Sequence, residues 1–148
     1  MKSQLVHRAA DGLRTFVVVM DTGDEAMAAL KQFAHEEAVS GAGLTAIGAF
    51  GRASILYFDW EAKQYRRIPV EEQVEVAAAI GDVGRGENGE QAVHLHVVLG
   101  RRDGSALAGH LDEGHVRPTL EIIVTETPAH LRRVHDPGSG LALIDLAR

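Results

Sequence analysis

Two histidines, His94 and His96, interrupt the otherwise apolar stretch AVHLHVVLG. In an extended strand, residues two apart point to the same side of the sheet, about 6.5–7 Å apart along the chain. These two imidazoles therefore share one face of a predicted strand, whereas the opposite face carries only Val and Leu. Because a buried strand is not stabilised by two imidazoles, the pattern indicates that this face has a chemical role.

A third histidine, His110, follows the turn sequence RRDGS. A two-residue Asp-Gly turn would place core leucines opposite polar positions, whereas a three-residue loop with a left-handed Gly104 keeps the two faces separate. The apolar pattern therefore favours the loop 102–104, which pairs Arg101 with Ser105. The cross-strand pairs expected from this register are Leu95 with Leu111, Leu99 with Leu107, His96 with His110, and His94 with Asp112.

Three imidazoles on one surface predict a metal site. Directly opposed Cβ atoms lie about 4.5–5.5 Å apart, close enough for two rings to share one ion at about 2.0–2.1 Å. Neutral imidazoles suit Zn²⁺, with Ni²⁺, Cu²⁺ or Fe²⁺ as alternatives. Three protein ligands leave one position open, and Asp112 is expected either as a fourth ligand or as the acceptor that orients His94. The alternative is a set of ordinary polar residues on a solvated face or in a subunit contact.

Three further residues could reach the same pocket. His115 approaches from a loop, Glu121 lies on the next predicted strand, and Glu75 interrupts the apolar run VEVAAAI. If the metal activated a water molecule, Glu121 or Glu75 would be the candidate base of an enzyme whose substrate the sequence does not name. Exposure on a strand or at the surface is the ordinary explanation for all three.

The elements that must position these residues are mostly strands. Residues 13–21 predict a strand, and residues 22–41 predict an amphipathic helix with acidic residues at its start and Gly41 at its end. One helix followed by many strands is typical of an α+β fold with a mainly antiparallel sheet. The further strand segments expected from the period of two are 44–50, 52–60, 64–70, 72–83, 92–100, 105–111, 119–126 and 140–146.

Two other segments are less regular. Residues 128–135, PAHLRRVH, predict a second, short helix. The string GRGENG matches G-x-G-x-x-G literally, but a strand rather than a helix follows it, so it predicts a hairpin loop and not a dinucleotide site.

Composition bounds the class of protein. The 148 residues are enough for one domain with a real core, and the absence of cysteine excludes disulfides and thiolate metal sites. Neither a signal peptide nor a membrane-length apolar run is visible, which favours a cytoplasmic protein. The formal net charge is −6, with 21 acidic and 15 basic residues, so charge does not support DNA binding.

Three stretches of the sequence resemble the PPC domain (plants and prokaryotes conserved). They are GLTAIGAFGRASILYFD, VHLHVVLGRRDGSALAGHL and TLEIIVTE, within a match from about Arg14 to Leu146. The resemblance implies a single domain over residues 1–148, with a curved, mainly antiparallel sheet of about seven strands packed against one long helix and short helices. It also implies a homotrimer and a metal, such as zinc, bound by His94, His96 and His110.

Three functions follow as hypotheses. The first is a trimeric metal-binding module that assembles or binds a small ligand. The second is a DNA-binding or transcription-associated protein, because plant relatives carry AT-hook segments, although this chain has no R-G-R-P hook. The third is a metal-dependent enzyme. The apolar faces of residues 44–50 and 52–60, with Tyr57 and Trp60, are expected to supply subunit contacts.

Overall fold

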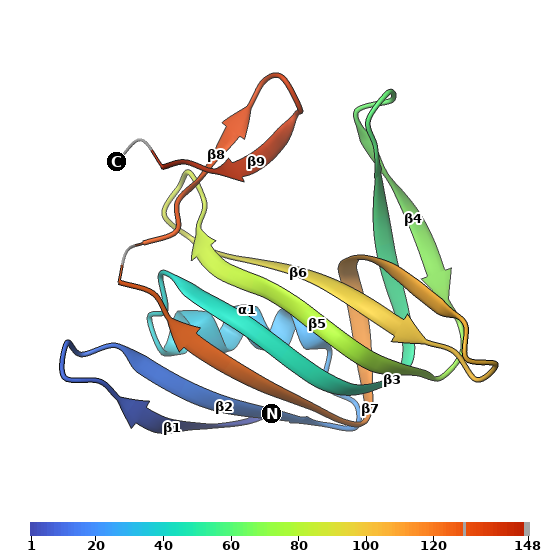
Figure 1. Ribbon diagram of the computed structural model, residues 1–148, viewed down its shortest axis with the longest axis horizontal. Helices are drawn as coiled ribbons and strands as arrows, with labels where there is room; N and C mark the ends of the chain where they lie inside the picture. Colours follow the sequence, from blue (N-terminus) through green and yellow to red (C-terminus); the bar gives the residue numbers. More distant parts are fainter. Residues whose placement is uncertain (129, 147–148) are drawn as a thin grey trace.

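The computed structural model describes residues 1–128 and 130–146. Most of its strands form one strongly curved sheet (Figure 1). All described strands but the last two belong to this sheet, and the last two form a separate hairpin. The elements in chain order are β1 (Lys2–Arg8), β2 (Arg14–Asp21), α1 (Ala26–Glu36), β3 (Ala42–Asp59), β4 (Gln64–Val70), β5 (Val74–Arg85), β6 (Gln91–Gly100), β7 (Ala106–Glu126), β8 (Arg133–Asp136) and β9 (Leu141–Ile144).

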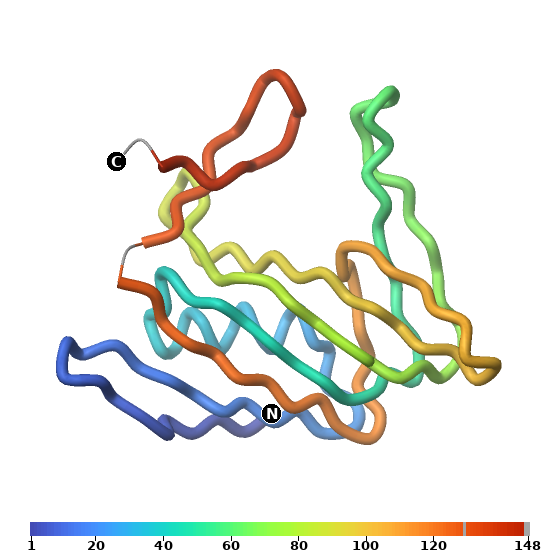
Figure 2. The backbone as a smooth tube through the Cα atoms, viewed as in Figure 1, coloured from blue at the N-terminus to red at the C-terminus, as the bar shows by residue number. Residues whose placement is uncertain are grey.

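The seven strands are paired in the order β1-β2-β7-β6-β5-β3-β4, and every pairing is antiparallel. β7 is 21 residues long: its first part pairs with β6, its last part pairs with β2, and much of its length pairs with β3. Because β3 and β7 each have different neighbours along their length, the sheet bends back on itself (Figure 2). This confirms the predicted antiparallel sheet of about seven strands.

The core lies between the inner face of the sheet and α1. The helix buries Met27, Leu30 and Phe33, and the Phe33 ring packs edge-to-face on Phe16 of β2 with 5.3 Å between centroids. The apolar face of β6 enters the same core, as its alternation predicts. The outward face of β6 is therefore the face that carries the histidines.

The helix is shorter than the 20-residue segment predicted for it. It begins after Glu25, whose side chain accepts hydrogen bonds from the amides of Met27 and Ala28. It ends at Glu36, because Ala38 adopts a left-handed conformation with φ 52° and the Val39 amide donates to the Ala34 carbonyl. Gly41 therefore does not end the helix.

The C-terminal prediction also needs correction. Within the described residues, the segment predicted as a second helix has no helix and enters β8, which pairs with β9; Ala129 lies outside the described residues. The turn of this hairpin is closed locally, since Asp136 accepts a hydrogen bond from the Ser139 amide and its carbonyl accepts one from Gly140. α1 is thus the one helix in the described part of the chain. β1 was not predicted from the sequence.

The loop between β6 and β7 has the predicted geometry. The Arg101 amide donates to the Ser105 carbonyl over 2.8 Å, and Gly104 has φ 84°. This three-residue loop pairs Leu99 with Leu107. Residues 86–89 of the string GRGENG likewise lie in the hairpin loop that connects β5 to β6, as predicted, whereas Gly84 and Arg85 end β5.

Candidate metal centre

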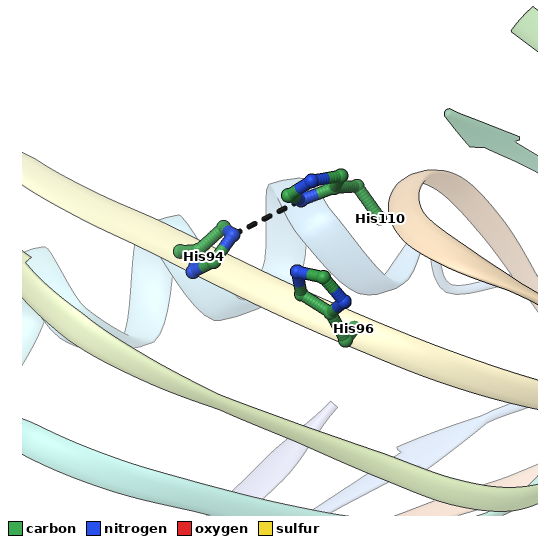
Figure 3. A group of neighbouring side chains, drawn as sticks. All are labelled: His94, His96 and His110. Carbon is green, nitrogen blue, oxygen red and sulfur yellow. Dashed lines mark hydrogen bonds between the residues drawn. The ribbon is translucent and has the colours of Figure 1, made fainter. Parts of the chain in front are cut away.

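The three histidines converge on the outward face of the β6–β7 pair (Figure 3). His94 and His96 come from β6 and His110 from β7, and His96 lies directly opposite His110 as the register predicted. Ring centroids are 5.0 Å apart for His94 and His96, 5.0 Å for His94 and His110, and 4.0 Å for His96 and His110. One nitrogen from each ring lies within 4.8 Å of the other two. We refer to these residues as the histidine cluster.

The spacing fits one transition-metal ion. Two nitrogens bound tetrahedrally at about 2.0–2.1 Å are separated by about 3.3 Å, so only small side-chain movements would bring all three rings onto an ion. His94 Nε2 and His110 Nδ1 are already 3.0 Å apart. Imidazole nitrogen is a donor that Zn²⁺ prefers, and a set of three leaves one coordination position open.

The local electrostatics favour neutral imidazoles, which are the form that binds a metal. Burial, followed by the charges of His96, His94 and Arg133, lowers the pKa of His110 to about 4. Burial and the charge of His94 also lower the pKa of His96 from its usual range. At neutral pH both rings are therefore uncharged, and each has one nitrogen lone pair with which it can bind a metal.

An ion pair that the sequence analysis missed lies beside the cluster. Asp82 of β5 is directly opposite His94, and its Oδ2 lies 3.7 Å from His94 Nδ1. Arg133 of β8 donates to both carboxylate oxygens, over 2.9 and 2.7 Å, and its Nη2 lies 3.2 Å from His94 Nδ1. Burial alone would raise the pKa of Asp82, but hydrogen bonds and charges from His94 and Arg133 lower it.

A signal for Asp82 was present in the sequence. Once GRGENG is taken as a hairpin loop between two strands, pairing Arg85 with Gln91 places Asp82 opposite His94. Arg133 carried no such signal, because its contact with Asp82 spans 51 residues and depends on the C-terminal hairpin.

Asp112 is not at the position predicted for it. The β6–β7 ladder ends at the His96–His110 pair, and beyond it β7 continues to pair with β3 on its other edge. The Asp112 carboxylate accepts a hydrogen bond from Ser54 Oγ and pairs with Arg67 Nε, each over 3.0 Å. The predicted pairing of His94 with Asp112 was therefore wrong, and Asp82 lies opposite His94 instead.

The other predicted pocket residues also lie elsewhere. Glu75 and Glu121 are exposed and line a separate cavity of about 540 Å³ whose lining includes none of the three histidines. His115 lies near Arg52, with 3.3 Å between its Nε2 and the guanidinium. The geometry brings none of these three residues to the histidine cluster.

Tyr65 of β4 is a further neighbour that the sequence did not indicate. Its ring packs edge-to-face on His110 with 5.1 Å between centroids, and its hydroxyl lies 3.5 Å from His110 Nε2. Burial raises the pKa of the Tyr65 phenol, an effect opposed by the charge of Arg133. The phenol therefore stays protonated at neutral pH and can donate a hydrogen bond beside the cluster.

Comparison with known families matches residues 7–128 to the Plants and Prokaryotes Conserved (PCC) domain, also written PPC. The chain belongs to this family. A PPC protein of known structure from Pyrococcus horikoshii is 33% identical, with a TM-score of 0.84 over 93% of this chain and 95% of that one. No curated protein matches the sequence significantly.

Two further solved structures share the PPC fold. A protein from Archaeoglobus fulgidus, described as metal-containing, is 30% identical with a TM-score of 0.82, over 88% of this chain and 91% of that one. A protein from Bacteroides thetaiotaomicron, described as a candidate DNA-binding protein, is 27% identical with a TM-score of 0.86, over 96% of each chain. In the described part of this PPC chain, no helix is long and apolar enough to cross a membrane.

Proposed function

We propose that this PPC protein is a cytoplasmic homotrimer, one domain per chain over residues 1–148, that binds zinc or another divalent transition metal through His94, His96 and His110. The observation that carries the proposal is the convergence of three imidazoles from two strands within 4.8 Å. The description of the Archaeoglobus fulgidus relative as metal-containing supports it.

The surroundings of the histidine cluster suit a bound cation. Asp82 Oδ2 lies 3.7 Å from His94 Nδ1, so a small side-chain movement would let it accept the Nδ1 proton and leave Nε2 directed to the other histidines for a metal. Arg133 holds the carboxylate with two hydrogen bonds, so Asp82 cannot turn away. The ion would supply a Lewis-acidic position, open to a ligand, on the floor of a cavity. Neither Glu75 nor Glu121 is placed to act as a base there.

Trimer formation is supported by an exposed apolar face of the sheet. Ile47 of β3, Ile80 of β5 and Ile123 of β7 are 62%, 61% and 44% exposed. Exposed apolar residues gathered on one face commonly mark a protein interface. Tyr57 and Trp60, at 60% and 58% exposed, form a second exposed apolar group on the β3–β4 hairpin. We propose that these residues are buried between subunits, as the apolar faces of 44–50 and 52–60 predicted.

Elemental analysis of untagged protein tests the metal centre. We expect about one transition-metal ion per chain, and loss of that ion in His96→Ala. His35→Ala is the matched control, because His35 is exposed on α1 and distant in sequence from the cluster. The proposal would be contradicted if the wild-type protein stayed metal-free after dialysis against micromolar Zn²⁺. It would also be contradicted if His96→Ala bound as much metal as the wild-type protein.

DNA binding is the second candidate, favoured by the description of the Bacteroides thetaiotaomicron relative. The net charge of −6 opposes contacts with phosphates. Fluorescence anisotropy with duplex DNA at two salt concentrations separates the candidates. Micromolar binding that weakens steeply with salt would favour DNA binding, and the absence of binding at low salt would exclude direct contact.

A further inference from the structure

A cavity of about 410 Å³ lies above the histidine cluster, between two hairpins that rise from the same side of the sheet (Figure 1). One hairpin is β3–β4, which contributes Tyr65, and the other is β8–β9. His94 and His110 border the cavity from β6 and β7. Its volume is within the range of about 300–1,000 Å³ that is usual for small-molecule sites.

The β8–β9 hairpin is attached firmly to the rest of the protein. Arg133 is 11% exposed and donates to Asp82 on one side and to the Ala142 carbonyl of its own hairpin on the other. Its Nε is buried without a hydrogen-bond partner among the described residues. The hairpin lies beyond the residues 7–128 that match the family, so this wall of the cavity is not part of the matched domain.

The polar part of the lining favours an anion. The chain carries a net charge of −6, yet none of the described residues that line this cavity is acidic. The charge of Arg133 is balanced by its ion pair with Asp82, and Tyr65 contributes a protonated hydroxyl that can donate a hydrogen bond to a ligand. A divalent cation on the histidine cluster would supply the positive charge that attracts an anion, because imidazole ligands bind a metal in their uncharged form and do not cancel its charge.

The remaining lining is apolar. Leu141 and Leu143 of β9 line the cavity. Leu143 is 44% exposed, so it retains surface that a ligand could cover. A metal ion with one open coordination position beside an apolar wall suits a singly charged organic anion better than inorganic phosphate, which has no apolar part to bury.

We propose that this cavity binds a small organic carboxylate with an apolar body. The carboxylate lies at the Arg133, Tyr65 and histidine end, and the apolar body packs on Leu141 and Leu143. The inference rests on the proposed metal centre, since the open coordination position supplies part of the attraction for the anion. It identifies the class of ligand and assigns its recognition to the C-terminal hairpin.

Cobalt-loaded protein provides a direct test, because the visible spectrum of Co²⁺ changes when a ligand enters its coordination sphere. We expect benzoate to change the spectrum saturably and to bind at least about tenfold more tightly than benzyl alcohol or inorganic phosphate. A benzoate affinity no higher than that of benzyl alcohol in protein that holds Co²⁺ would overturn the carboxylate proposal. Failure of Co²⁺ to bind at all would instead refute the metal centre, and this proposal with it.

A matched pair of variants tests the role of the hairpin. Leu143→Ser removes apolar surface that lines the cavity, whereas Ile144→Ser changes the next residue of β9, which is 40% exposed and does not line the cavity. Calorimetric titration with benzoate should show about fivefold weaker binding for Leu143→Ser and unchanged binding for Ile144→Ser. Equal effects of the two substitutions would refute the assignment to this wall, and the Co²⁺ spectrum confirms that each variant keeps its metal site.

Discussion

Replacing Asp82 by Asn tests whether this carboxylate orients His94, the proposed metal ligand. The amide keeps the shape of the side chain but removes the charge that faces His94 Nδ1 at 3.7 Å and Arg133 at 2.7 and 2.9 Å. Loss of an acceptor behind a histidine ligand typically weakens metal binding about 10–100-fold, or roughly 1.4–2.8 kcal/mol. We expect a change of that size in the Zn²⁺ dissociation constant, measured by competition with a chromophoric chelator.

The stability of the metal-free protein should fall in the same variant. Asp82 and Arg133 are 19% and 11% exposed, so Asp82→Asn leaves a guanidinium largely buried without its counter-charge. Breaking a fully buried pair costs about 3–5 kcal/mol, and discounting for the residual exposure gives about 2–3 kcal/mol. Urea denaturation at fixed protein concentration measures this difference, since a trimer's stability depends on concentration.

Asp112→Asn is the matched control for Asp82→Asn. The Asp112 carboxylate is bound by Ser54 and Arg67 rather than by the cluster, so its loss should leave the Zn²⁺ dissociation constant within about twofold of the wild-type value. A large effect of Asp112→Asn, or none of Asp82→Asn, would refute the assignment of Asp82 as the positioning residue.

Three further predictions concern protonation, core packing and assembly. The lowered pKa of His110, about 4, means that the unfolded chain binds more protons than the folded one between pH 6.5 and pH 4. The urea midpoint of metal-free protein should therefore decrease as the pH is lowered from 6.5 to 4. The decrease should be smaller in His110→Gln. Phe33→Ala should destabilise the protein by about 3–5 kcal/mol in urea, because it empties the space against Phe16; unchanged stability would refute that packing. Ile80→Asp should convert the proposed trimer to smaller species in sedimentation velocity, and an unchanged profile would exclude this face from the interface.

The histidine cluster was predictable because its geometry depends on local signals. The alternation of AVHLHVVLG fixes which face of β6 carries His94 and His96, and Asp103-Gly104 fixes the turn. The left-handed Gly104 and the Arg101–Ser105 pairing then set the register of β7. A slip of one residue would have turned His110 to the core, so the apolar pattern decides the outcome.

The rest of the site depends on long-range geometry that periodicity does not show. Asp112 was expected opposite His94 because the sequence does not show that the β6–β7 ladder stops at His110. Arg133 reaches the site only because residues 133–136 form a strand and not the predicted helix. The length of α1 was overestimated, since Ala38 adopts the left-handed conformation usually associated with Gly.

Anomalous diffraction at the zinc absorption edge, from crystals of untagged protein grown with Zn²⁺, tests the metal centre most directly. The account predicts one strong peak per chain, with nitrogens of His94, His96 and His110 at about 2.0–2.1 Å. A structure in which the three rings surround no peak, or in which zinc is held by carboxylates elsewhere, would contradict it.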